Sequence, residues 1–210
     1  MLRDMEPAWQ TVMSLAWDAY QVGTTPIGAV VLDSSGCIVA TARNRRHEDV
    51  WITGQLANSR IAHAELNALA QLPHDRYEGH SLYANVEPCC LCMGAVLQAG
   101  IGTVRYGWRD GYAGAASCMT VSNPQVSRRS VDIAGPSGGM VELLTGLLMA
   151  SHYIYVRPAP DHVVTPWRNA RPQVFALAAN PAVADVIRDA AAAGGTVGDL
   201  ADALQPLIAL

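Results

Sequence analysis

The sequence predicts an α/β fold, a three-layer α-β-α sandwich around a mixed central sheet, followed by a C-terminal helical extension. Three observations support this. Half of the 210 residues are hydrophobic and only 15% are charged, so a packed core is expected. Helix-like and strand-like segments follow one another in the order helix, hairpin, helix, strand, helix, strand. Further short helical segments follow a proline-rich stretch near the C-terminus.

The first third of the chain predicts a helix, a hairpin and a long loop. Apolar residues at helical spacing predict a helix over 7–20, with Gly23 as its C-terminal stop. Two apolar runs, 27–32 and 37–41, flank a polar turn and predict a β-hairpin. The segment 42–60 is polar and is expected to be a loop.

The middle of the chain predicts two helices, each followed by a strand. A helix is expected over 61–72, ended by Pro73, and a strand over 81–86. A second helix is expected over 89–98, ending at Gly100, with a further strand over 103–106. This alternation is what predicts helices on both faces of one sheet.

The last quarter of the chain predicts a linker and two helices. Four prolines between residues 157 and 172 indicate a linker or an extended segment. Asn180 and Pro181 are suited to the start of a helix that ends near Gly194, and another helix begins near Thr196. We therefore expect a domain over 1–156, a Pro-rich linker over 157–172 and a helical extension over 173–210.

Charge and cysteine content narrow the classes of partner. Fourteen basic residues, all Arg, face 18 acidic ones, and the resulting net charge of −4 disfavours a polynucleotide partner. The start Met1–Glu6 lacks the apolar run of a secretory signal, and the apolar segment Met140–Ala150 is interrupted by polar residues. Five cysteines, an odd number, do not resemble a secreted disulfide framework. A cytoplasmic protein without a membrane partner is expected.

Two short segments carry metal-binding chemistry. His63-Ala64-Glu65 and Pro88-Cys89-Cys90-Leu91-Cys92 each lie at the start of a predicted helix. Cys89 and Cys92 are three residues apart, so their sulfurs share one helix face, and a helix N-terminus favours the thiolate. Two thiolates and one imidazole are ligands that Zn²⁺ takes, and three protein ligands are typical of a catalytic site.

Glu65 is suited to a second role in this site. It lies two residues from His63 and can approach a zinc-activated water without being a ligand, to accept a proton and pass it on. Two other interpretations remain. The cysteines could form a redox pair in a thioredoxin-like fold, or Cys90 or Cys118 could complete a structural zinc site.

The order H-x-E followed by P-C-x-x-C is the signature of zinc-dependent nucleobase deaminases. From about Trp9 to Val156 the chain resembles the cytidine-deaminase-like superfamily of zinc-dependent nucleobase and nucleoside deaminases. Within it, the resemblance is to the branch of tRNA adenosine deaminases and guanine deaminases. The segments that carry it are Pro26–Ala29, Asn44, His63–Glu65, Glu87–Ala95, Ile101–Gly107, Arg109–Asp110 and Gly114–Ala115.

The resemblance implies a role for individual residues. Zn²⁺ would be held by His63, Cys89 and Cys92, and Glu65 would be the catalytic proton shuttle. The Asn44 amide would contact the base, and the Ala64 N–H and the Glu87 carbonyl would line the pocket. Asp110 would lie close to the substrate, with a turn-forming role as the alternative. Trp51, in the loop after Asn44, is a candidate substrate contact or a packing residue.

The resemblance leaves the substrate open between two classes. Nineteen positions separate Asn44 from His63, more than tRNA deaminases usually have, and residues 173–210 lack a basic helix. We therefore expect a small aminated nucleobase or nucleoside of the purine type, with a tRNA wobble adenosine as the alternative and a non-catalytic zinc or redox module as a third. The segment Arg43–Arg46 could face phosphates but is more typical of a solvated surface. A homodimer is implied by the resemblance.

Overall fold

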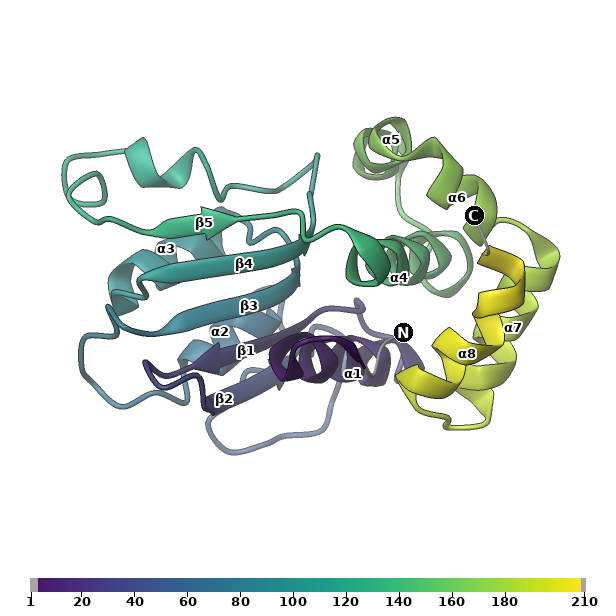
Figure 1. Cartoon of the computed structure of the whole chain (residues 1–210), viewed down its shortest axis with the longest axis horizontal. Coiled ribbons are helices and arrows are strands. Elements are labelled where there is room, and N and C mark those ends of the chain that lie inside the picture. Colours follow the sequence, from purple (N-terminus) through teal and green to yellow (C-terminus); the bar gives the residue numbers. More distant parts are fainter. Residues whose placement is uncertain (1–3, 209–210) are drawn as a thin grey trace.

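A five-stranded mixed sheet forms the centre of the molecule in a computed structural model that describes residues 4–208 (Figure 1). The strand order is β2-β1-β3-β4-β5. The hairpin pair and the β1–β3 pair are antiparallel, and the β3–β4 and β4–β5 pairs are parallel. The strands are β1 (Gly28–Leu32), β2 (Ile38–Arg43), β3 (Ser81–Val86), β4 (Thr103–Trp108) and β5 (Asp132–Ala134).

Helices cover both faces of this sheet, which confirms the three-layer α/β class. Figure 1 shows α2 (Ala64–Leu69) and α3 (Cys90–Ala99) behind the sheet, and α1 (Pro7–Gln21) and α4 (Gly139–Ser151) on the near side. Alternate side chains of β1 pack against the helices on opposite faces of the sheet. Val31 packs in the cluster with α2 and α3, whereas Val30 packs against α1. Because both faces are covered, every residue of β1 is buried.

Gly28 shows how closely α1 approaches the sheet. A Cβ atom at this position would lie 2.3 Å from the Val12 carbonyl oxygen, so only glycine fits the present spacing. The Gly28 N–H donates a hydrogen bond at 2.9 Å to the Oδ1 atom of Asn85, which lies on the neighbouring strand β3.

The predicted helix over 61–72 is too long at both ends. His63 has extended backbone angles and caps α2, which begins at Ala64. After Leu69 the N–H groups of Gln71 and Leu72 bond to carbonyls three residues back, as in a tightened final turn. The first helix, the hairpin and the 81–86 strand are confirmed, and α3 ends at Gly100 in the left-handed conformation.

The interpretation of 157–172 as an extended linker is wrong for most of its length. Residues 161–170 form α5 (Asp161–Ala170), and α6 (Pro172–Ala178) follows. Pro160 caps α5 and Pro172 opens α6, so two of the prolines mark helix starts. The two C-terminal helices are confirmed as α7 (Pro181–Ala192) and α8 (Val197–Ile208), with the Asn180 side chain accepting from the Ala182 N–H at 2.9 Å.

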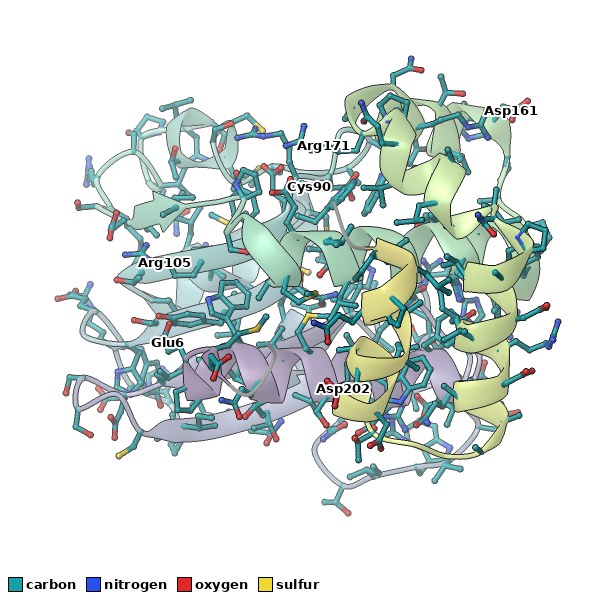
Figure 2. The ribbon with its side chains drawn as sticks, turned by 45° about the vertical axis from the view of Figure 1, so that its right-hand side comes forward. Glu6, Cys90, Arg105, Asp161, Arg171 and Asp202 are labelled. Carbon is teal, nitrogen blue, oxygen red and sulfur yellow. The ribbon has the colours of Figure 1, made fainter. Side chains whose placement is uncertain are left out.

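The C-terminal helices pack on the sandwich rather than extend away from it. Figure 2 brings α7 and α8 forward, where they lie against α1. The Trp17 indole of α1 donates a hydrogen bond to the Gly195 carbonyl at 2.7 Å, and one apolar cluster includes residues of α1, α4, α7 and α8. The expected bounds of the domain, 1–156, and of the helical extension, 173–210, stay predictions.

One helical run is apolar and long enough to cross a membrane by length and composition alone. It joins α4 to the π-helical turn η3 (His152–Val156) and spans Gly139–Val156, of which 56% is buried inside the protein. Leu144, Leu147 and Leu148 are fully buried in the same cluster as α1. Core packing therefore accounts for the apolar character of this helix. Of the start Met1–Glu6, residues 1–3 lie outside the described residues.

Candidate active site

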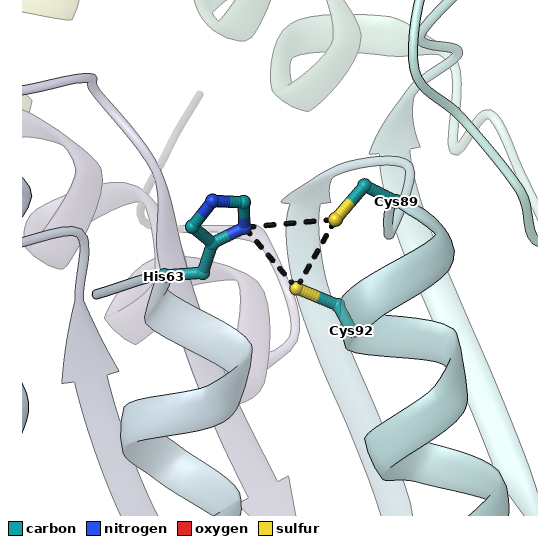
Figure 3. Close-up of side chains that lie close together, drawn as sticks. All are labelled: His63, Cys89 and Cys92. Atoms are coloured by element: carbon teal, nitrogen blue, oxygen red, sulfur yellow. Dashed lines mark hydrogen bonds between the residues drawn. The ribbon is translucent and has the colours of Figure 1, made fainter. Parts of the chain in front are cut away.

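Three side chains from two helix starts converge on one point (Figure 3). His63 is the N-cap of α2 and Cys89 is the N-cap of α3, with Cys92 in the first turn of α3. The His63 Nδ1 atom lies 3.6 Å from the Cys89 sulfur and 3.3 Å from the Cys92 sulfur, and the two sulfurs are 3.6 Å apart. The sequence-predicted ligands are therefore brought together.

These separations fit a zinc ion. Tetrahedral Zn²⁺ with ordinary bond lengths places two thiolate sulfurs about 3.8 Å apart, and a sulfur and an imidazole nitrogen about 3.5 Å apart. The observed distances agree with both values to within about 0.2 Å. Within residues 4–208, His63, Cys89 and Cys92 are the side chains that lie close enough together to bind one metal ion. Cys90 and Cys118 are exposed and do not belong to this cluster. A set of three ligands leaves a tetrahedral position for water or substrate.

Hydrogen bonding within the cluster favours a thiolate. The bond from Cys92, followed by that from His63, lowers the pKa of Cys89 to about 4 despite its burial. The same Cys89–Cys92 bond and burial raise the pKa of Cys92 well above its ordinary value. The Cys89 bond raises the pKa of His63. Zn²⁺ binds the thiolate and neutral imidazole forms, so its binding would displace the protons that Cys92 and His63 hold in this hydrogen-bonded cluster.

Glu65 lies beside the cluster without joining it. Its side chain is 3% exposed and is hydrogen-bonded to Cys92. Burial raises the pKa of the Glu65 carboxyl, and the nearby His63 opposes that rise. Burial makes the Glu65 carboxylate a better proton acceptor than an exposed one, which suits a group that accepts a proton and returns it.

Asn44 is held in one orientation at the end of β2. It is 2% exposed, and its Oδ1 accepts hydrogen bonds from the Thr24 hydroxyl at 2.9 Å and from the Arg46 N–H at 3.1 Å. These two bonds occupy the carbonyl end of the amide. The Nδ2 end is therefore the hydrogen-bonding group that Asn44 can offer to a ligand.

The other sequence-predicted site residues take different positions. Ala64 is fully buried at the start of α2. Glu87 is buried, and its side-chain oxygen accepts from the Ala116 N–H at 3.2 Å. Asp110 accepts from the N–H groups of Tyr112 and Ala113, so it forms a turn, and its half-buried carboxyl has a pKa raised by burial. Trp51 is 77% exposed and borders a hollow of about 570 Å³ whose lining excludes the zinc ligands.

Several structural residues near the site were missing from the sequence interpretation. Asn67 is fully buried in α2, and its amide bonds to both the N–H and the carbonyl of Leu56, at 2.7 and 2.9 Å. The Thr24 hydroxyl fixes the orientation of the Asn44 amide by donating to its Oδ1 atom. Burial, followed by the nearby Asp110 charge, raises the pKa of Tyr153 in η3. The spacing of His63 and Asn67, one turn apart on one helix face, is the signal that could have identified Asn67.

Similarity to known proteins agrees with this geometry. The family described as "Cytidine and deoxycytidylate deaminase zinc-binding region" matches residues 3–108, about half of the chain. The chain belongs to this family. It is 32% identical over 136 residues to the tRNA-specific adenosine deaminase of Bacillus subtilis, covering 63% of this chain and 78% of that one.

Two further proteins are similar to parts of this chain. The chain is 36% identical over 115 residues to the tRNA(Ile)-lysidine synthase of Deinococcus radiodurans, which is 53% of this chain but only 18% of that protein's length. A guanine deaminase structure from Nitrosomonas europaea superposes with a TM-score of 0.53 at 19% identity, covering 70% of this chain and 84% of that one. This last similarity shows the shared fold, and a thioredoxin-like redox fold is thereby excluded.

Proposed function

We propose that this deaminase-family chain is a zinc-dependent hydrolase that removes the amino group of a small nucleobase or nucleoside, of the purine type, and releases ammonia. The observation that carries the proposal is the cluster of His63, Cys89 and Cys92 with the buried Glu65 carboxyl beside it. A cytoplasmic location and a homodimer remain predictions.

Proton transfer is the task proposed for Glu65. Bound at His63, Cys89 and Cys92, Zn²⁺ would supply the Lewis acidity that makes water nucleophilic at neutral pH. In the reaction a C–O bond forms from water at the ring carbon and the C–N bond to the amino group breaks. Glu65 would accept a proton from water and deliver it to the adjacent ring nitrogen. It would then accept the proton of the newly added hydroxyl group and pass it to the leaving amine, so that ammonia departs and a carbonyl forms.

Base positioning is the task proposed for the residues around the cluster. Asn44 would donate from Nδ2 to an acceptor on the ring, because its carbonyl end is already bonded to Thr24 and Arg46. The Ala64 N–H at the start of α2 and the Glu87 carbonyl would contact the ring and the departing amino group. Asp110 would lie close to the substrate, in the turn that follows β4. Trp51 is exposed, so it would contact the substrate only if the 49–60 loop closes over the site.

The preference for a small substrate rests on charge and on the loop. The net charge of −4 and the C-terminal helices, which carry exposed Asp185, Asp189 and Asp202, are unfavourable for a polyanion. The loop between β2 and α2 is held against α2 by two hydrogen bonds between Leu56 and the Asn67 amide. It can therefore form one side of a compact binding site.

A tRNA adenosine deaminase is the second candidate function. Similarity to the Bacillus subtilis tRNA-specific adenosine deaminase, at 32% identity, favours it. Ammonia release by the zinc-loaded protein separates the two candidates. The compounds tested in this assay are free purine and pyrimidine bases, their nucleosides and 5′-monophosphates, and an anticodon stem-loop RNA.

The proposal expects steady ammonia release from at least one small purine compound and little from the RNA. Release from the RNA alone would favour the second candidate. The absence of release from every substrate, with zinc bound, would contradict both.

A further inference from the structure

Arg46 presents an unpaired cation inside the loop between β2 and α2. Its side chain is half-buried, and its Nε atom is buried without a hydrogen-bond partner. Within residues 4–208, no carboxylate lies within ion-pair distance of its guanidinium. A buried charged donor without a partner is unfavourable, so a structure retains one where a ligand can satisfy it.

The two neighbouring arginines differ from Arg46 in this respect. Arg43 pairs with Glu48 through its two terminal guanidinium nitrogens, and the fully buried Arg45 bonds to the same carboxylate at 3.3 Å. Glu48 therefore satisfies both of these side chains within the protein. Of the three arginines in the segment Arg43–Arg46, only Arg46 is left to bind something else.

Arg46 also lies at the proposed active site. Its N–H bonds to the Oδ1 of Asn44 at 3.1 Å, and the N–H of the preceding Arg45 bonds to the carbonyl of Ala62, the residue before His63, at 2.9 Å. These two hydrogen bonds place the Arg46 backbone next to Asn44 and one residue from a contact that reaches the His63 segment.

The acidic groups in this region are engaged elsewhere. Asp110 accepts from two N–H groups of its own turn, and Glu87 accepts from Ala116. Glu65 is hydrogen-bonded to Cys92. A ligand with its own negative charge is therefore the partner that Arg46 lacks.

We propose that Arg46 binds the phosphate of a mononucleotide substrate, so that this enzyme deaminates a nucleoside monophosphate in preference to the free base or nucleoside. The inference rests on the proposed function and narrows its substrate class. The planar guanidinium matches a phosphate with parallel hydrogen bonds, and phosphate is the anionic group that distinguishes a nucleotide from its nucleoside.

Binding can be measured apart from turnover in the zinc-loaded Glu65→Ala protein. Equilibrium dialysis compares adenosine with AMP, guanosine with GMP and cytidine with CMP, with and without Arg46→Gln. The nucleotide of the preferred base should bind about 10- to 100-fold more tightly than its nucleoside, as expected for charge-assisted hydrogen bonds. Arg46→Gln should abolish that difference and leave nucleoside binding within about twofold.

Two further variants guard against a general structural effect. Arg60→Gln removes an exposed arginine of the same loop and should preserve the nucleotide preference. Arg46→Lys retains the charge and should preserve part of the preference while losing the paired hydrogen bonds. If Arg46→Gln weakens nucleoside and nucleotide equally, or if nucleotides show no preference, the inference is wrong. An effect seen only with an anticodon stem-loop RNA also overturns it.

The two proposals fail in different ways. A nucleotide preference that depends on Arg46, in a protein whose Glu65-containing form releases no ammonia, would contradict the proposed function and keep the phosphate site. Deamination of nucleosides that is indifferent to Arg46 would keep the function and remove the phosphate site.

Discussion

His152 is a buried titratable side chain without a hydrogen-bond partner for its Nδ1 atom. It is 1% exposed, packs against the rings of Tyr20 and Tyr153, and begins the π-helical turn η3. Burial, followed by the charges of His47 and Arg157, lowers its pKa to about 4. The folded state therefore favours the neutral imidazole, whereas the unfolded chain binds a proton near pH 6.5.

The pH dependence of stability follows from that difference. Above about pH 6.5 both states are neutral at His152, and the folded state loses stability as the pH falls from there toward 4. The full loss from this group is on the order of 3 kcal/mol. Urea unfolding at pH 7 and pH 5 should show a smaller decrease in His152→Phe than in the natural protein. An equal decrease in both would contradict the account.

At the level of single residues, the metal ligands could be predicted from residue type and motif, although His63 and Cys89 lie on different helices. His63, Cys89 and Cys92 could be predicted as neighbours because each residue type and spacing matches one metal. The roles of Asn44 and Asp110 depend on partners distant in sequence or on turn geometry, such as Thr24 for Asn44. Trp51 could not be placed from sequence because an exposed loop residue carries no periodic signal.

Among the elements, the loop between β2 and α2 depends on Asn67. Its buried amide accepts a hydrogen bond from the Leu56 N–H and donates one to the Leu56 carbonyl, so Asn67→Ala leaves both backbone groups without these partners. We expect a loss of about 3 kcal/mol in the free energy of unfolding and faster amide exchange at Leu56. Gln98→Ala, at an exposed position of α3, should change stability by less than about 0.5 kcal/mol. Similar losses in both variants would show that Asn67 is not special.

The elements that could be predicted are those with a clear period and clear ends. The first helix and the two C-terminal helices show amphipathic spacing with a cap or a stop residue, and their bounds were close. The α4 helix is apolar on nearly all sides and shows little periodicity. The β5 strand has three residues at the sheet edge, too few for an alternating pattern.

For the whole molecule, the C-terminal helices and the sandwich share one core. Leu200 of α8 is fully buried in the cluster that includes Trp17 of α1 and Leu144 of α4. We therefore expect Leu200→Ala to lower stability by about 2–5 kcal/mol, with a single unfolding transition by fluorescence and by circular dichroism. Leu207→Ala, at a position 40% exposed on the same helix, should have a much smaller effect. Two separate transitions in Leu200→Ala would mean that the extension unfolds independently.

Segments η3 and α5, beyond the family match, also contact the turn that follows β4. Tyr153 of η3 lies edge-on to the Trp167 ring of α5 at 6.2 Å, and the Asp110 carboxyl is hydrogen-bonded to Trp167. Residues beyond the family match at 3–108 therefore contact the turn that follows β4. These contacts could not be predicted from the sequence, because they join segments that are far apart along the chain.

The central claim is that Glu65 transfers protons at a zinc site formed by His63, Cys89 and Cys92. Its most direct test is the rate of ammonia release by Glu65→Ala on the best substrate, with the zinc content of the same sample measured. The account predicts about one zinc per chain in both proteins and a rate lowered by about 10²- to 10⁴-fold in the variant. A zinc-loaded Glu65→Ala protein with unchanged turnover would contradict the account.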